Sequence, residues 1–230
     1  MEPAPAFIGI VLAAGSGDTM GGHKGLVAVR WGEGPGELPL AIAHARAMLD
    51  GGAERVLIVA RSDAARVLLR FGQRGLDILA SNLEADFGPA ASVQSALRFL
   101  SLTAHGPCAY MITPVGLPPA SGSIRQALLG AMAKSADVSA VRATFEGKRG
   151  YPILVRDTAL EAFLTGAAPS VAELSPAELP PLDAVLSALD TNCVDVPVID
   201  PRATTDLDTP EQVEAWYHTP VRFFSPDDDR

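Results

Sequence analysis

Residues 8–26 hold the side chains whose types and spacing point most directly to chemistry. The stretch reads IGIVLAAGSGDTMGGHKGL, an apolar run that leads into a glycine-rich turn ending at Lys24. Glycines allow backbone conformations that side chains forbid, so the backbone amides of such a turn can face an anion. Lys24 adds a mobile positive charge of the kind that holds phosphate groups. We therefore predict a phosphate-binding loop over residues 15–24.

This loop matches neither of the two common nucleotide fingerprints. The sequence lacks GxxxxGK[ST], and Gly15-Ser16-Gly17 has no third glycine at the dinucleotide spacing. His23, beside Lys24, has two readings: it contacts a phosphate, or it is a solvated loop histidine.

The loop instead resembles the nucleotidyltransferase signature L-A-A-G-x-G-x-R-M-G-x-x-K. The positions in register are Leu12, Ala13, Ala14, Gly15, Gly17, Met20, Gly21 and Lys24. The resemblance implies that this segment binds the nucleotide and that Lys24 is catalytic. Where the family carries an arginine that grips the triphosphate, this chain has Thr19, so a fork of charged donors is replaced by a neutral hydroxyl.

Later landmarks narrow the resemblance to the MobA-like group, the molybdenum-cofactor nucleotidyltransferases and their relatives. SNLEADFGPAASVQSAL resembles the group's asparagine and glycine-serine loop, which implies nucleotide contacts from Asn82 and Ser92. For both residues, capping of the helix that starts near residue 91 is the alternative. EGKRGYPILV resembles its G-x-R-G-x-P stretch, which implies acceptor binding by Arg149 and Gly150. An exposed hairpin charge is the alternative reading of Arg149.

The landmark at residues 113–120, TPVGLPPA, departs from the family pattern. The family reads P-V-D-x-P here, and its aspartate binds the magnesium ion that bridges the nucleotide phosphates. This chain has Gly116 at that position. Magnesium usually takes one or two carboxylates together with substrate phosphates, so we expect weak or doubtful Mg²⁺ binding.

The closing landmark, TTDLDTPEQVEAW, resembles the family's D-x-D-T-P-E motif. The resemblance implies that Asp206 and Asp208 bind a metal and that Asp206 takes part in catalysis; a ribose contact is the alternative for Asp206. Asp208 has a structural reading as well, since an aspartate before Thr-Pro-Glu is typical of a helix N-cap.

Composition excludes several partner classes. The chain has 230 residues, 48% of them hydrophobic, and a formal net charge of −9. Nucleic-acid and anionic-membrane surfaces need clustered Lys and Arg, so we expect neither partner. Cys108 and Cys193 lack metal-ligand spacing, and no secretory signal or long apolar run is found, so we predict a cytoplasmic protein.

Strand-like and helix-like segments alternate in the order typical of a mostly parallel sheet covered by helices. The sequence predicts strands over 7–15, 54–61, 76–81 and 108–118, helices over 39–52, 63–75, 91–101 and 123–135, and two strands within 137–156. Residues 167–181 read as irregular. We place a domain at residues 1–218 and an acidic, frayed tail at 219–230.

The fold class that follows is α/β: a single-domain, Rossmann-like nucleotidyltransferase fold with an open, mixed, mostly parallel sheet and helices on both faces. Two functions stay open. The first is transfer of a nucleoside monophosphate from an NTP, with CTP or GTP favoured, to a molybdopterin-like or other small phosphorylated acceptor. The second is a catalytically degenerate relative that binds a nucleotide or a partner protein.

Overall fold

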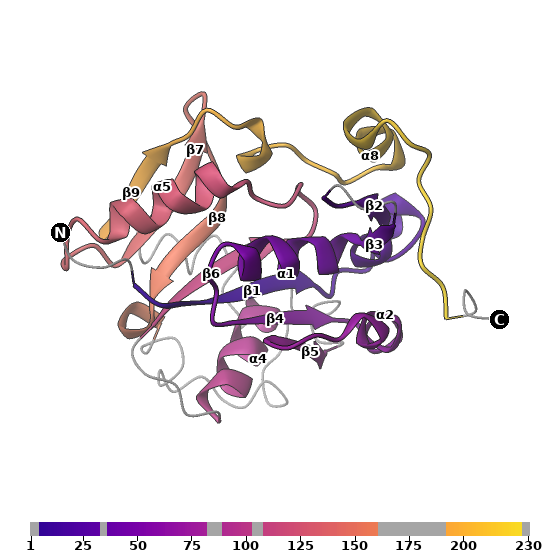
Figure 1. Ribbon diagram of the computed structural model, residues 1–230, viewed down its shortest axis with the longest axis horizontal. Helices are drawn as coiled ribbons and strands as arrows, with labels where there is room; N and C mark the ends of the chain where they lie inside the picture. The colour runs from indigo at the N-terminus through magenta and orange to yellow at the C-terminus, as the bar shows by residue number, and fades with distance from the viewer. Residues whose placement is uncertain (1–4, 33–35, 82–88, 103–107, 161–191, 227–230) are drawn as a thin grey trace.

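A seven-stranded mixed sheet organises the chain (Figure 1). The computed structural model describes residues 5–32, 36–81, 89–102, 108–160 and 192–226. The sheet strands are β1 (Phe7–Ala13), β4 (Arg55–Ala60), β5 (Leu76–Ala80), β6 (Ala109–Pro114), β7 (Ala140–Phe145), β8 (Lys148–Arg156) and β9 (Cys193–Pro197). Their spatial order is β5-β4-β1-β6-β8-β7-β9, and only β8 runs antiparallel to its neighbours β6 and β7.

The remaining elements of the described residues are helices, short 3₁₀ turns and a small antiparallel ribbon. The helices are α1 (Leu40–Asp50), α2 (Ser62–Leu68), α4 (Pro89–Ser101), α5 (Gly122–Met132) and α8 (Pro210–Tyr217). The 3₁₀ turns are η1 (Asp18–Met20), η2 (Lys24–Leu26), η3 (Leu69–Phe71) and η6 (Pro201–Ala203), and the ribbon pairs β2 (Ala28–Arg30) with β3 (Glu37–Pro39).

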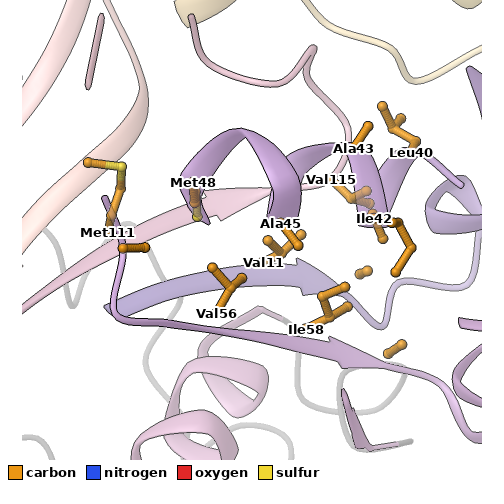
Figure 2. Close-up of a cluster of buried hydrophobic side chains, with 14 of the residues drawn as sticks. Val11, Leu40, Ile42, Ala43, Ala45, Met48, Val56, Ile58, Met111 and Val115 are labelled. Atoms are coloured by element: carbon orange, nitrogen blue, oxygen red, sulfur yellow. The ribbon is translucent and has the colours of Figure 1, made fainter. Parts of the chain in front are cut away.

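Both faces of the sheet are buried, and β1 shows why. Its side chains alternate between two hydrophobic clusters, with Val11 in one and Ile10 and Leu12 in the other, as the period of two in a strand requires. Helices α1, α2 and α5 cover the first face, and α4 covers the second. Figure 2 shows α1 side chains such as Ile42 and Met48 packed against Val11 and Val56 of the sheet.

The predicted fold class is confirmed, with small corrections to the element ends. The first and fourth strands, predicted to reach residues 15 and 118, end at Ala13 and Pro114, and the helix expected over 63–75 gives way to a 3₁₀ turn after Leu68. The ribbon β2–β3 and strand β9 had no predicted counterpart. Residues 167–181, expected to be irregular, lie outside the described residues.

The segment that we set apart as a tail begins with residues bonded to the domain. Phe224 donates its backbone N–H to the carbonyl oxygen of Leu26 at 2.9 Å, and Phe223 forms a β-bridge with Val27. The Phe223 ring also lies against Gly22, where an added Cβ would be 3.0 Å from it. Residues 223 and 224 therefore fasten the end of the predicted phosphate loop.

Candidate nucleotide site

One cavity of about 690 Å³ lies at the carboxyl ends of β1 and β6. Because β8 is antiparallel to β6, its first residues reach the same edge of the sheet. The lining residues come from four segments: Leu12, Ala13, Gly15, Ser16, Gly17, Asp18, Thr19 and Lys24; Pro114, Val115, Gly116 and Leu117; Lys148, Arg149, Gly150 and Tyr151; Ala203, Thr204, Asp206 and Asp208. Parallel α/β sheets bind ligands at this edge.

The glycine-rich loop is held in a compact turn. Gly17 has φ of +72°, and a Cβ there would lie 2.1 Å from the carbonyl oxygen of Gly22, so only glycine fits. The backbone N–H groups of Met20 and Gly22 both donate to the Gly17 carbonyl, and the Met20 side chain is buried beneath the turn. The loop is thus a preformed concave backbone segment.

The Lys24 side chain lines the cavity but is paired with a carboxylate. Its Nζ donates to Oδ1 of Asp208 at 2.6 Å, and the two side chains are 24% and 54% exposed. The predicted phosphate ligand is therefore already partnered by a carboxylate from the other end of the chain. An incoming phosphate has to compete with Asp208 for this ammonium group.

Both departures from the family signature contact Asp208. Thr19 donates its hydroxyl to the backbone carbonyl oxygen of Asp208 at 2.8 Å. A Cβ added at Gly116 would lie 2.9 Å from Oδ1 of Asp208 and 3.8 Å from Nζ of Lys24. Gly116 also accepts a hydrogen bond from the N–H of Leu207 at 2.7 Å. The two substituted positions, Thr19 and Gly116, therefore both lie against Asp208, the carboxylate that pairs with Lys24.

Among the described residues, three basic side chains, Lys24, Lys148 and Arg149, and three carboxylates, Asp18, Asp206 and Asp208, line the cavity. This described part of the expected basic site is therefore formally neutral. Asp18 accepts a hydrogen bond from the Ser16 hydroxyl at 2.7 Å, which places a carboxylate within the phosphate loop itself. This charge balance weakens the attraction for a polyphosphate relative to an uncompensated basic pocket.

The described residues do not fit a magnesium site. Gly116 has no side-chain oxygen, Asp208 is engaged by Lys24, and only Asp206 lines the cavity without a hydrogen-bond partner in the described part of the chain. Within those same ranges no group of three His, Cys, Asp or Glu side chains is placed to hold a metal. Magnesium prefers a nearly octahedral set of oxygen ligands, which this arrangement does not supply from the protein.

The structure corrects the reading of Asp208 as a helix cap. Thr209 is the N-cap of α8: its side chain accepts from the Gln212 N–H, and the Gln212 side chain accepts in return from the Thr209 N–H at 3.0 Å. This reciprocal capping box leaves the Asp208 carboxylate free to face the cavity. The sequence pattern placed the cap one residue too early.

The other predicted site residues divide into three groups. Leu12, Ala13, Gly15, Gly17, Thr19 and the pair Arg149–Gly150 line the cavity, whereas Ala14 is buried beside it. Ser92 is fully buried on α4 and does not line the cavity formed by the described residues. Asn82 lies outside the described residues.

The part of the cavity that contains Arg149 and Gly150, the residues predicted to bind the acceptor, is built by β8 and η6. Arg149 donates to Asp195 of β9 at 3.1 Å, and the two side chains are about half exposed. A Cβ at Gly150 would lie 2.0 Å from the Ala203 carbonyl oxygen, so glycine allows β8 and η6 to touch. Lys148 stands next to Arg149 on the cavity wall; the sequence reading missed it, although it belongs to the same KRG turn.

Two histidines hold the site from outside the cavity. His23 bonds to Asp63 of α2 at 2.8 Å, so it anchors the loop end to that helix instead of standing in solvent. His44 of α1 is 2% exposed and its Nε2 lies 2.8 Å from the Leu117 carbonyl oxygen. Burial lowers the pKa of His44 to about 4, partly opposed by this backbone hydrogen bond, so the ring is neutral at pH 7 and donates to Leu117.

No helix among the described residues has the length and apolar character needed to cross a membrane.

Solved structures share this fold at low sequence identity. The Mycobacterium sp. strain JC1 homologue of Mycobacterium tuberculosis Rv0371c is 19% identical, with a TM-score of 0.65 over 92% of this chain and 95% of that one. The manganese complex of Rv0371c from Mycobacterium tuberculosis H37Rv is 16% identical, with a TM-score of 0.63 over 94% of this chain and 100% of that one. CMP:2-keto-3-deoxy-manno-octonic acid synthetase complexed with CTP is 12% identical, with a TM-score of 0.64 over 93% and 97%.

At these identities the structural likeness shows the fold alone. A comparison with curated proteins finds no match. The decisive finding is a family model, the MobA-like NTP transferase domain, which matches residues 9–172 and so covers the glycine-rich loop, the Gly116 segment and the KRG turn. The chain therefore belongs to the MobA-like NTP transferase family, with Thr19 and Gly116 in place of its signature arginine and metal-binding aspartate.

Proposed function

We propose that the protein binds a nucleoside triphosphate in the 690 Å³ cavity and transfers its nucleoside monophosphate to a small phosphorylated acceptor. One observation carries the proposal: the glycine-rich loop with Lys24, which follows β1, and the basic turn with Lys148 and Arg149, at the start of β8, line the same cavity, and β6 lies between these two strands in the sheet. That arrangement offers two places for phosphate groups in one space. CTP and GTP are the favoured donors, and a molybdopterin-like compound is the favoured acceptor.

The protein itself contributes little covalent chemistry to this reaction. An oxygen of the acceptor phosphate attacks the α-phosphorus of the triphosphate, a new P–O bond forms, and the bond to the leaving pyrophosphate breaks. Catalysis then consists of positioning and of neutralising charge on the reacting phosphates. In this chain the loop amides would orient the triphosphate, Lys24 would neutralise it once released from Asp208, and Arg149 with Lys148 would orient the acceptor.

No carboxylate at position 116 contributes to this chemistry, so we propose slow turnover. The structural likeness to a manganese complex makes Mn²⁺ a sensible alternative to Mg²⁺ in any assay. If an added metal ion were held mainly by the nucleotide phosphates, Asp206, which lines the cavity without a hydrogen-bond partner in the described chain, would be the protein carboxylate able to contact it.

The second candidate is a nucleotide-binding relative that does not catalyse transfer. The Lys24–Asp208 pair at 2.6 Å favours it, because the pair occupies both the Lys24 ammonium group and one of the two aspartates, Asp206 and Asp208, that were expected to bind a metal. Such a protein would bind a nucleotide in the 690 Å³ cavity without turnover, to sense the nucleotide or to present a surface to a partner protein.

Calorimetric titration of CTP, GTP and ATP, each with no metal, with Mg²⁺ and with Mn²⁺, tests binding. Pyrophosphate release in the presence of a small phosphorylated acceptor tests transfer. Binding together with release supports the transferase, and binding without release under every metal condition supports the second candidate. If no nucleotide binds under any condition, both candidates fail.

A further inference from the structure

The segment that forms α2 and the turn η3 is strongly basic, in a chain whose formal net charge is −9. Residues 61–74 contain four arginines and a single acidic residue. That carboxylate, on Asp63, is already bonded to His23. None of the residues 61–74 is among the described residues that line the nucleotide cavity. This excess of positive charge therefore has no role in the site described above.

Two of the arginines lie one helical turn apart. Arg66 belongs to α2, Arg70 belongs to η3, which continues it, and both side chains are exposed. Residues four apart on a helix share a face and are separated by about 6 Å along its axis. Arg66 makes no hydrogen bond or ion pair with the described part of the chain. We call the surface formed by the side chains of Arg66 and Arg70 the arginine face.

The C-terminal segment, residues 222–225, is bonded to the end of the nucleotide loop. Ala28 donates its backbone N–H to the carbonyl oxygen of Arg222 at 2.8 Å. Phe224 donates its N–H to the carbonyl oxygen of Leu26 at 2.9 Å. These two hydrogen bonds break if the segment lifts away from the loop.

The same segment then reaches the arginine face. The Phe224 ring meets the Phe71 ring of η3 edge to face, with 5.2 Å between the ring centroids. Arg70 donates from Nη1 to the carbonyl oxygen of Ser225 at 2.9 Å. Figure 1 shows the C-terminal chain running from α8 toward α2, in agreement with these contacts. Ser225 is therefore held beside one of the two arginines.

Three aspartates follow this anchored residue almost directly. Asp227, Asp228 and Asp229 are the second, third and fourth residues after Ser225, and they lie outside the described residues. A chain advances at most about 3.6 Å per residue, so their reach is up to about 7 to 14 Å beyond Ser225. Arg66 is only about 6 Å along the helix from the arginine that holds Ser225. An acidic run is thus tethered within reach of the arginine face.

We propose that residues 227–229 dock on the arginine face and thereby hold the C-terminal segment against the end of the nucleotide loop. Exposed ion pairs are individually weak, but the short tether gives the aspartates a high effective concentration at the arginines. The contact is intramolecular. It goes beyond the proposed transfer reaction and does not depend on it.

Amide hydrogen exchange of Phe224 and Ala28, followed by NMR, tests the proposal because both N–H groups are freed when the segment lifts. In the parent protein both amides should exchange faster at about 1 M salt than at about 0.01 M, since the Debye length falls from about 30 Å to about 3 Å. The variant with Asp227→Asn, Asp228→Asn and Asp229→Asn should exchange about threefold faster at low salt. It should also lose most of the salt dependence.

Arg66→Glu tests the other partner and should speed exchange of the two amides about threefold at low salt. The matched control is Arg98→Glu, at an exposed arginine on α4, which covers the opposite face of the sheet. It should leave both exchange rates unchanged. Added to the variant with three asparagines, Arg66→Glu should have almost no further effect, because the charges that it would repel are gone.

Four results would overturn the proposal. They are exchange that does not depend on salt in the parent protein, equal effects of Arg66→Glu and Arg98→Glu, additive effects of Arg66→Glu and the three asparagines, and exchange that slows as the protein concentration rises. The last result would mean that the aspartates of a second copy occupy the arginine face. The salt dependence of the parent protein needs no variant, so the test does not rest on the folding of any of them.

Discussion

Lys24 and Asp208, 184 residues apart in the sequence, join their side chains at 2.6 Å across the nucleotide cavity. The Asp208 carboxylate can take this position because residue 116 is glycine. A Cβ at position 116 would lie 2.9 Å from Oδ1 of Asp208. The Thr19 hydroxyl donates a hydrogen bond to the backbone carbonyl oxygen of the same aspartate. The two departures from the family signature are therefore one structural unit, and most of the predictions below concern it.

Asp208→Asn should strengthen triphosphate binding in the absence of metal by up to about tenfold, because it frees the Lys24 ammonium group and removes a negative charge from the cavity. The melting temperature should change little, since both side chains are partly exposed and such pairs contribute at most about 1 kcal/mol. Calorimetry of CTP and GTP measures the gain. Asp206→Asn, which removes the same charge without touching Lys24, is the control and should give a smaller gain.

Lys24→Ala should weaken nucleotide binding by roughly tenfold, about the value of one charge-assisted contact. The variant also leaves Asp208 unpaired and facing the phosphates, which adds repulsion to the lost attraction. Lys134→Ala, at an exposed lysine after α5, is the matched control. If Lys24→Ala binds nucleotide as tightly as the parent protein, the loop over residues 15–24 is not the phosphate site.

Gly116→Asp should place a second carboxylate against Asp208. Gly116 does not have positive φ, so the obstacle is the 2.9 Å approach to Asp208 and not the backbone. Without metal the variant should melt at a lower temperature because two like charges meet. Added Mg²⁺ or Mn²⁺ should restore the melting temperature, since two adjacent carboxylates are a typical start of a divalent site. If neither Mg²⁺ nor Mn²⁺ changes the melting temperature of the variant, no metal site has formed.

The double variant Thr19→Arg with Gly116→Asp should gain metal-dependent triphosphate affinity, and neither single change should suffice. Each change returns one half of the charge arrangement that the family uses, and groups acting on one charge distribution are strongly non-additive. Titrations of all three variants with and without Mg²⁺ measure the coupling. A normally melting double variant without any gain would favour the non-catalytic candidate.

Lowering the pH should destabilise the protein through His44. Its folded-state pKa is about 4 against 6.5 in the unfolded chain. Between these values the unfolded state binds more protons, so stability is full above the unfolded pKa and falls as pH drops toward the folded pKa. The loss should reach ~2 kcal/mol at about pH 5. The fall in melting temperature from about pH 7 to about pH 5 should be shallower in His44→Gln. If the melting temperatures of the parent protein and of His44→Gln fall equally between these pH values, His44 is not the cause of the destabilisation.

The sequence predicted the fold and the position of the glycine-rich turn, because both depend on local signals. The apolar run of β1 and the glycine at position 17 are recognisable from neighbouring residues alone. The contacts of Asp208 were not predictable in this way, because Lys24, Thr19 and Gly116 reach it only through long-range folding. Its misreading as a cap has a local cause: Asp208 and Thr209 are both good cap residues, and the Gln212 side chain decides between them.

The bonds from Phe223 and Phe224 to the loop end, and those from Thr19 to Asp208, have a consequence for the order of events during synthesis. The sheet neighbours β1, β4 and β5 lie within the first 80 residues of the chain and can pair early on the ribosome. The nucleotide loop follows β1 directly, yet its supports are among the last residues translated. A nascent chain should therefore pair β1, β4 and β5 before its nucleotide loop is supported, because that support stays incomplete until residues 206–224 emerge.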